Sequence, residues 1–270
     1  KLVTVLAAPV LVLIILAAVG VRERSEDSSD AKRVKQLTEF VTVNAELINQ
    51  LEWEMVLSGA YLGSENNEFG TELEEQKGRT DEAYDKFEAA IASIDPGSDS
   101  AAIAEALQDA QQWLANLETY RTSVELGQQI PTDVIANYSS TAGDLIAVNG
   151  QMVQVASDPQ LLLGLNTVAN FERIQQARST SYALAVSVAA AGQFRDTTNE
   201  PCLVAPSGEL VATQCASYNA LLDSLDQETQ ATNTFDENAS KADKDVKTDA
   251  MAALPVDTLT EEIIDQGEND

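Results

Sequence analysis

The sequence has no histidine, only two cysteines, and aromatic residues at 5% of its 270 positions. Histidine is the commonest general base and the commonest metal ligand, so its absence excludes Ser-His and Cys-His catalytic pairs. Cations are also scarce, with 16 Lys+Arg against 44 Asp+Glu and a net charge of −28. This field repels nucleic acid and anionic lipid headgroups, so neither is expected as a partner. We expect no catalytic residue, metal site or cofactor.

The residues that abound are those that favour helices. Ala, Leu, Val, Glu, Asp and Gln are frequent, and hydrophobic residues make up 44% of the chain, enough for a core. No segment alternates apolar and polar residues over a strand-like length between hairpin turns. The expected fold is all-α, with antiparallel helices of about 25–35 residues in one or two up-down bundles.

Residues 2–21, LVTVLAAPVLVLIILAAVGV, form a run of 20 residues without a charge. That is the length of a helix that crosses a bilayer, and we expect an uncleaved membrane anchor over residues 1–22. A cleaved signal peptide is the alternative. The acidic bulk of the chain and its cysteine pair place the main domain outside the cytoplasm.

After the anchor, each helical segment carries one apolar stripe with spacings of three, four and seven residues. Glycine, proline and asparagine clusters separate the segments. They define one helical domain over residues 26–254, and an acidic tail over 255–270 that leads toward an expected second membrane span. The predicted helices cover about 34–62, 69–94, 100–127, 134–155, 159–194 and 212–238, with a short helix on either side of Pro255.

The two cysteines, Cys202 and Cys215, bracket the short segment PCLVAPSGELVATQC. In an oxidising compartment they would form a disulfide that stabilises the folded state by about 3 kcal/mol. We expect this disulfide. Two unrelated buried thiols are the alternative.

Two arginines fall on apolar stripes and need an explanation. Arg121 is the only cation between Phe87 and Glu172. Arg178 lies on the apolar stripe of the helix predicted over 159–194. A buried guanidinium is costly unless it is paired or bound to a ligand. It either lines an anion pocket between helices or pairs with one of the many carboxylates. Arg173, next to Glu172, is expected to form a surface pair.

Three segments resemble the nitrate- and nitrite-sensing domain family: LEWEMVLSGAYLGS, FGTELEEQKGRTDEAYDKFEAAI and FERIQQARSTSYALAVSVAAAGQF. The resemblance implies two helical bundles that bind a small ligand between helices, outside the membrane, in receptors such as sensor histidine kinases. Arg178 matches an arginine of the family pattern, whereas Met55 stands where the pattern has another. Methionine is an apolar filler that cannot attract nitrate, so this position argues against nitrate as the ligand.

These observations predict an extracytoplasmic ligand-sensing domain of a membrane receptor of the sensor histidine kinase type. We expect it to act as a homodimer that binds a small ligand such as an anion and transmits a helix displacement across the membrane. An interaction bundle without a small ligand is the alternative. The residues expected to bind the ligand are Met55, Ser58, Tyr61, Arg121, Arg178 and Ser181.

Overall fold

The computed structural model describes residues 28–93, 101–154, 159–196, 198–202 and 215–251. These ranges contain helices and one isolated bridge, Arg195 with Pro201, but no strand, so the all-α prediction is confirmed. The helices are α2 (Ser28–Gly63), α3 (Gly70–Ser93), α4 (Ala101–Leu114), α5 (Leu117–Glu125), α6 (Pro131–Gln154), α7 (Pro159–Ala191), α8 (Ala216–Asn238) and α9 (Lys241–Met251).

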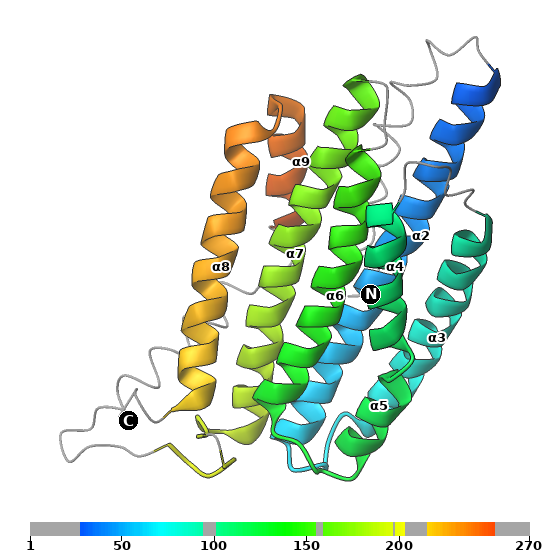
Figure 1. The fold of residues 1–270 in the computed structure, drawn as a ribbon. Coiled ribbons are helices and arrows are strands. Elements are labelled where there is room, and N and C mark those ends of the chain that lie inside the picture. The colour runs from blue at the N-terminus through cyan, green and yellow to red at the C-terminus, as the bar shows by residue number, and fades with distance from the viewer. Residues whose placement is uncertain (1–27, 94–100, 155–158, 197, 203–214, 252–270) are drawn as a thin grey trace.

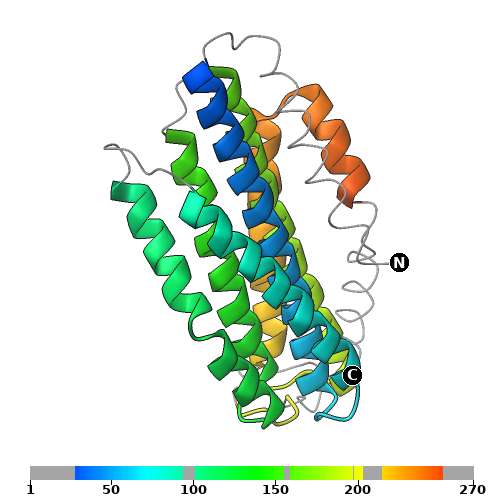
Figure 2. The ribbon, with the colours of Figure 1, turned by 90° about the vertical axis from the view of Figure 1, so that its right-hand side faces the viewer.

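Three helices, α2, α6 and α7, pack against one another at the centre of the bundle (Figures 1 and 2). Helix α3 covers α2 and α4 covers α6 on one side, while α8 covers α7 on the other. Consecutive long helices are antiparallel, but α2 and α7 run in the same direction. Their C-terminal ends meet, since Gly63 lies against Ser187 and Gly59 lies near Ala183.

Pairs of aromatic rings join the outer helices to the central ones. Phe40 of α2 packs on Phe87 of α3 with 5.7 Å between ring centroids, and Phe171 of α7 packs on Phe235 of α8 at 6.0 Å. Each pair contributes about 0.5–1.5 kcal/mol beyond the area that it buries. The few aromatic residues of this chain therefore stabilise helix pairing on both sides.

The structure differs from the prediction in one helix. The segment expected to be continuous over 100–127 is divided into α4 and α5 by a turn at residues 115–116. Asn116 is the reason, because its side-chain amide donates to the Gln112 carbonyl and its backbone N–H bonds to Trp113, three residues back. Such local bonds compete with the helical pattern.

Several predictions fall on parts of the chain outside the described ranges: the anchor at 1–22, the tail at 255–270, the second helix near Pro255 and the start of the helix placed at 212. No helix within the described ranges is long and apolar enough to cross a membrane. The expected disulfide between Cys202 and Cys215 is present.

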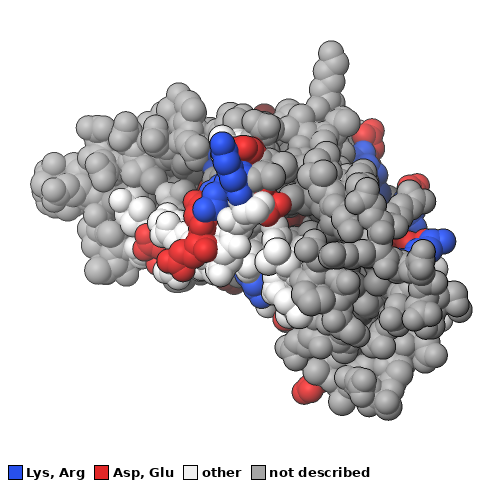
Figure 3. Space-filling model, turned by 90° about the horizontal axis from the view of Figure 1, so that it is seen from above, with Lys and Arg blue, Asp and Glu red and all other residues white. Residues whose placement is uncertain are grey.

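At the upper end of the bundle, basic and acidic side chains of the described surface lie side by side (Figure 3). The ion pairs of Lys35 with Glu39 and of Lys247 with Asp236 illustrate this mixing. The Lys35–Glu39 pair is exposed and contributes at most about 1 kcal/mol, whereas Lys247 is largely buried.

Gly63 sets the distance between the C-terminal ends of α2 and α7. A Cβ atom built on Gly63 would lie 2.3 Å from the carbonyl oxygen of Ser187, closer than real atoms approach. A Cβ atom on Gly59 would lie 3.0 Å from a methyl group of Ile135 on α6 and 3.4 Å from the Ala183 carbonyl oxygen of α7, the latter an ordinary contact distance. The two helices can be this close only because Gly63 has no side chain.

We predict that Gly63→Ala lowers the free energy of unfolding by about 1–3 kcal/mol, because α7 backbone must move to admit the methyl group. The matched control is Gly78→Ala on α3, where a Cβ atom would meet nothing within 4 Å. Without that obstacle, alanine should stabilise the helix by about 0.5–1 kcal/mol. Urea unfolding of both variants measures the difference, and equal midpoints would show that the close contact is not required.

Candidate functional site

Arg121 on α5 lies inside the bundle, with 4% of its surface exposed, and its guanidinium is fully engaged by protein acceptors. Its Nε and Nη2 donate to the two carboxylate oxygens of Glu54 at 2.8 and 2.9 Å. Its Nη1 donates to Asp81 at 2.7 Å and to Glu118 at 2.6 Å, and Nη2 also reaches the Lys77 carbonyl at 3.3 Å. Five bonds use the five N–H groups of a guanidinium, so an anion would have to displace one of these acceptors.

Two further side chains complete this group. The Tyr138 hydroxyl of α6 donates to the Glu54 carboxylate at 2.7 Å. Burial, followed by the Glu54 charge, raises the pKa of Tyr138 well above its ordinary value, which keeps the phenol protonated as a donor. The buried Ser58 lies one turn after Glu54 on α2 and bonds to the same phenol. The group therefore joins α2, α5 and α6 through one buried carboxylate.

Arg178 on α7 forms a separate group at the α7–α8 interface, with 3% of its surface exposed. Its Nη1 donates to the Glu228 carboxylate of α8 at 2.6 Å. One turn further along α7, the Ser181 hydroxyl donates to the Ser224 hydroxyl at 3.0 Å. A guanidinium and two hydroxyl groups thus lie on adjoining turns of the same interface.

The structure brings some of the predicted ligand-binding residues together and separates others. Ser58 and Arg121 share one group, and Arg178 and Ser181 share another, on opposite sides of the central helices (Figure 1). The Tyr61 ring lies elsewhere, within 3.5 Å of where a Cβ of Gly70 would stand, at the turn into α3.

Met55 is fully buried in the apolar core. It lies about one helical turn from both Gly59 and Glu52, so the three residues share one face of α2. Gly59 lies near Ala183 and Glu52 bonds to Ser179, so this face packs against α7. The position where the family pattern has a cation is therefore an interior position between the two central parallel helices. A role of Met55 in ligand binding stays a prediction.

A third buried group was not predicted, and it contains two carboxyl groups. On one side the Asn149 amide donates to both oxygens of Glu172 at 2.9 and 2.8 Å, and Asn44 donates to Asn149 at 2.8 Å. On the other side Ser179 donates to Glu52 at 3.0 Å. Burial raises the pKa of Glu52 and of Glu172 to about 8, and the charge of Glu172 adds to the shift of Glu52.

The expected surface pair of Arg173 with Glu172 is wrong. Glu172 points into the core toward Asn149, whereas Arg173 is exposed and donates to the Asn170 side chain. The reason is that α7 packs against α2, α6 and α8 and buries a much wider arc than a surface helix. For the same reason the apolar stripe did not single out Glu52 and Glu54, although their carboxyl groups inside an otherwise apolar segment were visible in the sequence.

Within the described ranges, no group of three or more acidic or cysteine side chains is arranged to hold a metal ion. The chemistry that these groups offer is hydrogen bonding and ion pairing with a small molecule.

We predict that Arg121→Met destabilises the protein by about 3–5 kcal/mol, because it leaves the Glu54 carboxylate buried without its cation. The double variant Glu54→Met, Arg121→Met should lose less stability than Arg121→Met alone, since no charge then remains unpaired. Chemical unfolding of the two single variants and the double variant tests this. Additive losses would mean that the pair is not coupled.

We also predict that stability falls as pH rises. The folded state keeps protons on Glu52 and Glu172 up to about pH 8, whereas the unfolded chain releases them near the ordinary value of 4.5. The stability that these two groups contribute should therefore be fully present below that lower value and be lost through the window up to about 8.

Urea midpoints measured from pH 5 to pH 9 check this window. Glu52→Gln and Glu172→Gln should each flatten the curve, while Glu75→Gln, at an exposed position of α3, should leave its slope unchanged. Parallel curves for all four proteins would contradict the buried, protonated state.

Comparison with known proteins agrees with this architecture. The sequence model of a family described as nitrate and nitrite sensing matches residues 46–270. No curated protein matches the sequence. Among solved structures, that of the NasR transcription antiterminator is similar, with a TM-score of 0.67 and 14% identity, over 93% of this chain and 74% of that chain. At this identity the likeness shows a shared fold.

Proposed function

The chain belongs to the nitrate- and nitrite-sensing family, and we propose that it is the extracytoplasmic sensing domain of a membrane receptor of the sensor histidine kinase type. A role in sensing a small ligand follows from the family. The membrane setting is supported by the run of 20 uncharged residues at 2–21, which ends a few residues before α2. The Cys202–Cys215 disulfide supports an oxidising compartment, since disulfides are rare in the cytosol.

The ligand is a small oxyanion that binds beside Arg178 between α7 and α8. Nitrate and nitrite are the first candidates because the family senses them, although Met55 supplies no cation and Arg178 must then hold the anion without a second arginine. The observation that carries this proposal is a buried guanidinium held by the carboxylate of Glu228, with the Ser181 and Ser224 hydroxyls one turn away. Hydroxyl and guanidinium donors are the groups that recognise planar oxyanions. Arg121 is a poorer candidate because three carboxylates surround it.

Binding would act by replacing a carboxylate with the ligand. An oxyanion that takes the place of Glu228 on Arg178 removes the ion pair between α7 and α8 and so favours a different packing of these helices. Helix α7 cannot shift without α2, because Gly63 and Ser187 are in direct contact. A ligand that prefers the shifted arrangement moves the equilibrium toward it, and α2 carries the displacement to the anchor of each subunit in a homodimeric receptor.

We predict opposite effects for the two partners of this ion pair. Arg178→Ala should weaken nitrate and nitrite binding about 30-fold or more, because the cation is lost. Glu228→Gln should strengthen binding several-fold, because the anion no longer competes with a carboxylate for Arg178. Arg173→Ala removes an exposed cation from the same helix and should leave affinity unchanged. Isothermal titration calorimetry of the purified chain measures all three.

The Glu228→Gln variant also controls for misfolding. It keeps the guanidinium, and the gain in affinity expected for it cannot result from an unfolded protein. If Arg178→Ala binds the anion as the unaltered chain does, the site is not at Arg178. If the unaltered chain binds neither anion, the interaction bundle without a small ligand becomes the better reading.

A further inference from the structure

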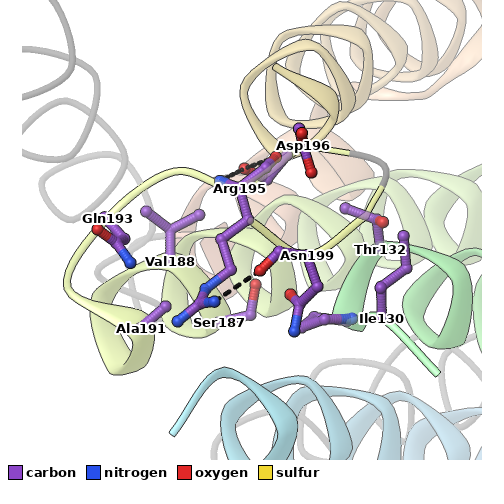
Figure 4. Close-up of a pocket in the computed structure, with 11 residues that line it drawn as sticks. Ile130, Thr132, Ser187, Val188, Ala191, Gln193, Arg195, Asp196 and Asn199 are labelled. Atoms are coloured by element: carbon purple, nitrogen blue, oxygen red, sulfur yellow. Dashed lines mark hydrogen bonds between the residues drawn. The ribbon is translucent and has the colours of Figure 1, made fainter. Parts of the chain in front are cut away.

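A pocket lies at the end of the bundle where α7 ends and α6 begins (Figure 4). It is a small cavity of about 20 Å³ that opens to solvent, so a ligand larger than a water molecule would extend into its mouth. Its walls combine apolar side chains from the helix ends with polar ones from the segment after α7. Those used below are Ile130, Thr132, Val188, Arg195, Asn199 and Ser217.

The segment after α7 is held in a fixed turn. The Asp196 carboxylate accepts bonds from the Thr198 N–H and hydroxyl, both at 2.8 Å, and from the Glu200 N–H at 3.1 Å. These bonds lower the pKa of Asp196 and keep its charge occupied within the turn. Asn199 has a φ of 65°, a left-handed conformation that asparagine tolerates better than most residues.

The backbone of Arg195 is clamped as well. Its N–H donates to the Ser217 hydroxyl at 2.7 Å, and its carbonyl accepts from the Ser217 N–H at 3.0 Å. The Cys202 N–H donates to the carbonyl of Phe194, the residue before Arg195. The disulfide between Cys202 and Cys215 ties this segment to the start of α8. The side chain of Arg195 is therefore presented from a rigid support.

Two buried polar atoms of residues that line this pocket, Nε of Arg195 and Oδ1 of Asn199, have no hydrogen-bond partner among the described residues. The other nitrogens of Arg195 are placed by the Asn199 carbonyl at 2.7 Å and by the largely exposed Glu65 at 3.0 Å. A buried donor and a buried acceptor without partners each cost about 1–3 kcal/mol. A ligand that supplies one acceptor and one donor would recover this.

We propose that this pocket is a second ligand site, for a small carboxylate that carries a hydroxyl or ammonium group on the adjacent carbon. The carboxylate accepts from Nε of Arg195, and the hydroxyl or ammonium donates to Oδ1 of Asn199. The first turn of α6 at Thr132 adds a positive dipole end. The side chains of Ile130 and Val188 line the pocket and provide an apolar surface for a short substituent. Nitrate has no donor for Asn199 and is a poorer match.

The charges of the surroundings agree with this class. Arg195 contributes one positive charge, and Asp196 and Glu65 contribute two negative ones, so the net charge of −1 disfavours any ligand with a net negative charge, a dianion most of all. A zwitterion is the best fit, and a monoanion needs its own donor to offset the repulsion. The site does not depend on the anion site at Arg178, which lies on α7 well before Ser187, where this pocket begins.

The probes are glycolate and glycine, with acetate as the matched compound that lacks the donor. Titration of the full chain, followed through the Nε–H signal of Arg195 in ¹⁵N–¹H spectra, reports contact at the proposed atom. Loss of the signal in Arg195→Lys identifies it. We expect glycolate or glycine to shift this signal and to bind at least tenfold more tightly than acetate.

The variant Asn199→Gly removes the acceptor and keeps the left-handed backbone, since glycine adopts a positive φ freely. It should weaken glycolate or glycine binding about tenfold, the effect of losing one buried hydrogen bond. Arg173→Lys, at an exposed site, should leave it unchanged. The proposal is overturned if neither probe shifts the Arg195 signal, if acetate binds as tightly as the other two, or if Asn199→Gly has no effect.

Discussion

Gly63 brings α2 so close to α7 that an added Cβ atom would lie 2.3 Å from the Ser187 carbonyl oxygen, and the arrangement of the other helices depends on this contact. Two parallel helices in direct contact need antiparallel neighbours to fill the grooves beside them. Helix α6 packs against both α2 and α7, while α3 covers α2 and α8 covers α7. The same contact joins the two proposed ligand sites to α2, since Arg178 lies on α7 and Ser187 lines the second pocket.

The charge composition explains how the interior was filled. In a chain with 16 cations and 44 acidic residues, each buried cation has several carboxylates to pair with. Arg121 is used for structure, because Glu54, Asp81 and Glu118 satisfy it together. Arg178 forms its ion pair with Glu228, and a small oxyanion can take the position of this carboxylate. Glu52 and Glu172 remain without a cation in hydrogen-bond contact and are held protonated by burial instead.

Much of the fold was readable from the sequence. The apolar stripes and the breaks at Gly63 and Pro131 predicted the helices to within a few residues, because helix periodicity is a local property. The break at Asn116 was missed, since one side-chain bond to Gln112 decided it. For the candidate site, the stripes placed Arg121 and Arg178 in the interior, but their partners lie 67 and 50 residues away in sequence, where local patterns carry no information.

The sequence by itself determined the class of this protein: an all-α chain of strongly acidic charge. Helix periodicity and charge follow from residue type and spacing alone. The resemblance to the nitrate- and nitrite-sensing family and the pairing of Cys202 with Cys215 were expectations, which the family match and the structure then decided. Only the tertiary structure decided that Glu52, Glu54 and Glu172 lie inside and that Arg195 and Asn199 face a pocket. A helix packed on several sides buries polar positions that its own period does not mark, and a turn after a helix finds its partners only when the bundle end is assembled.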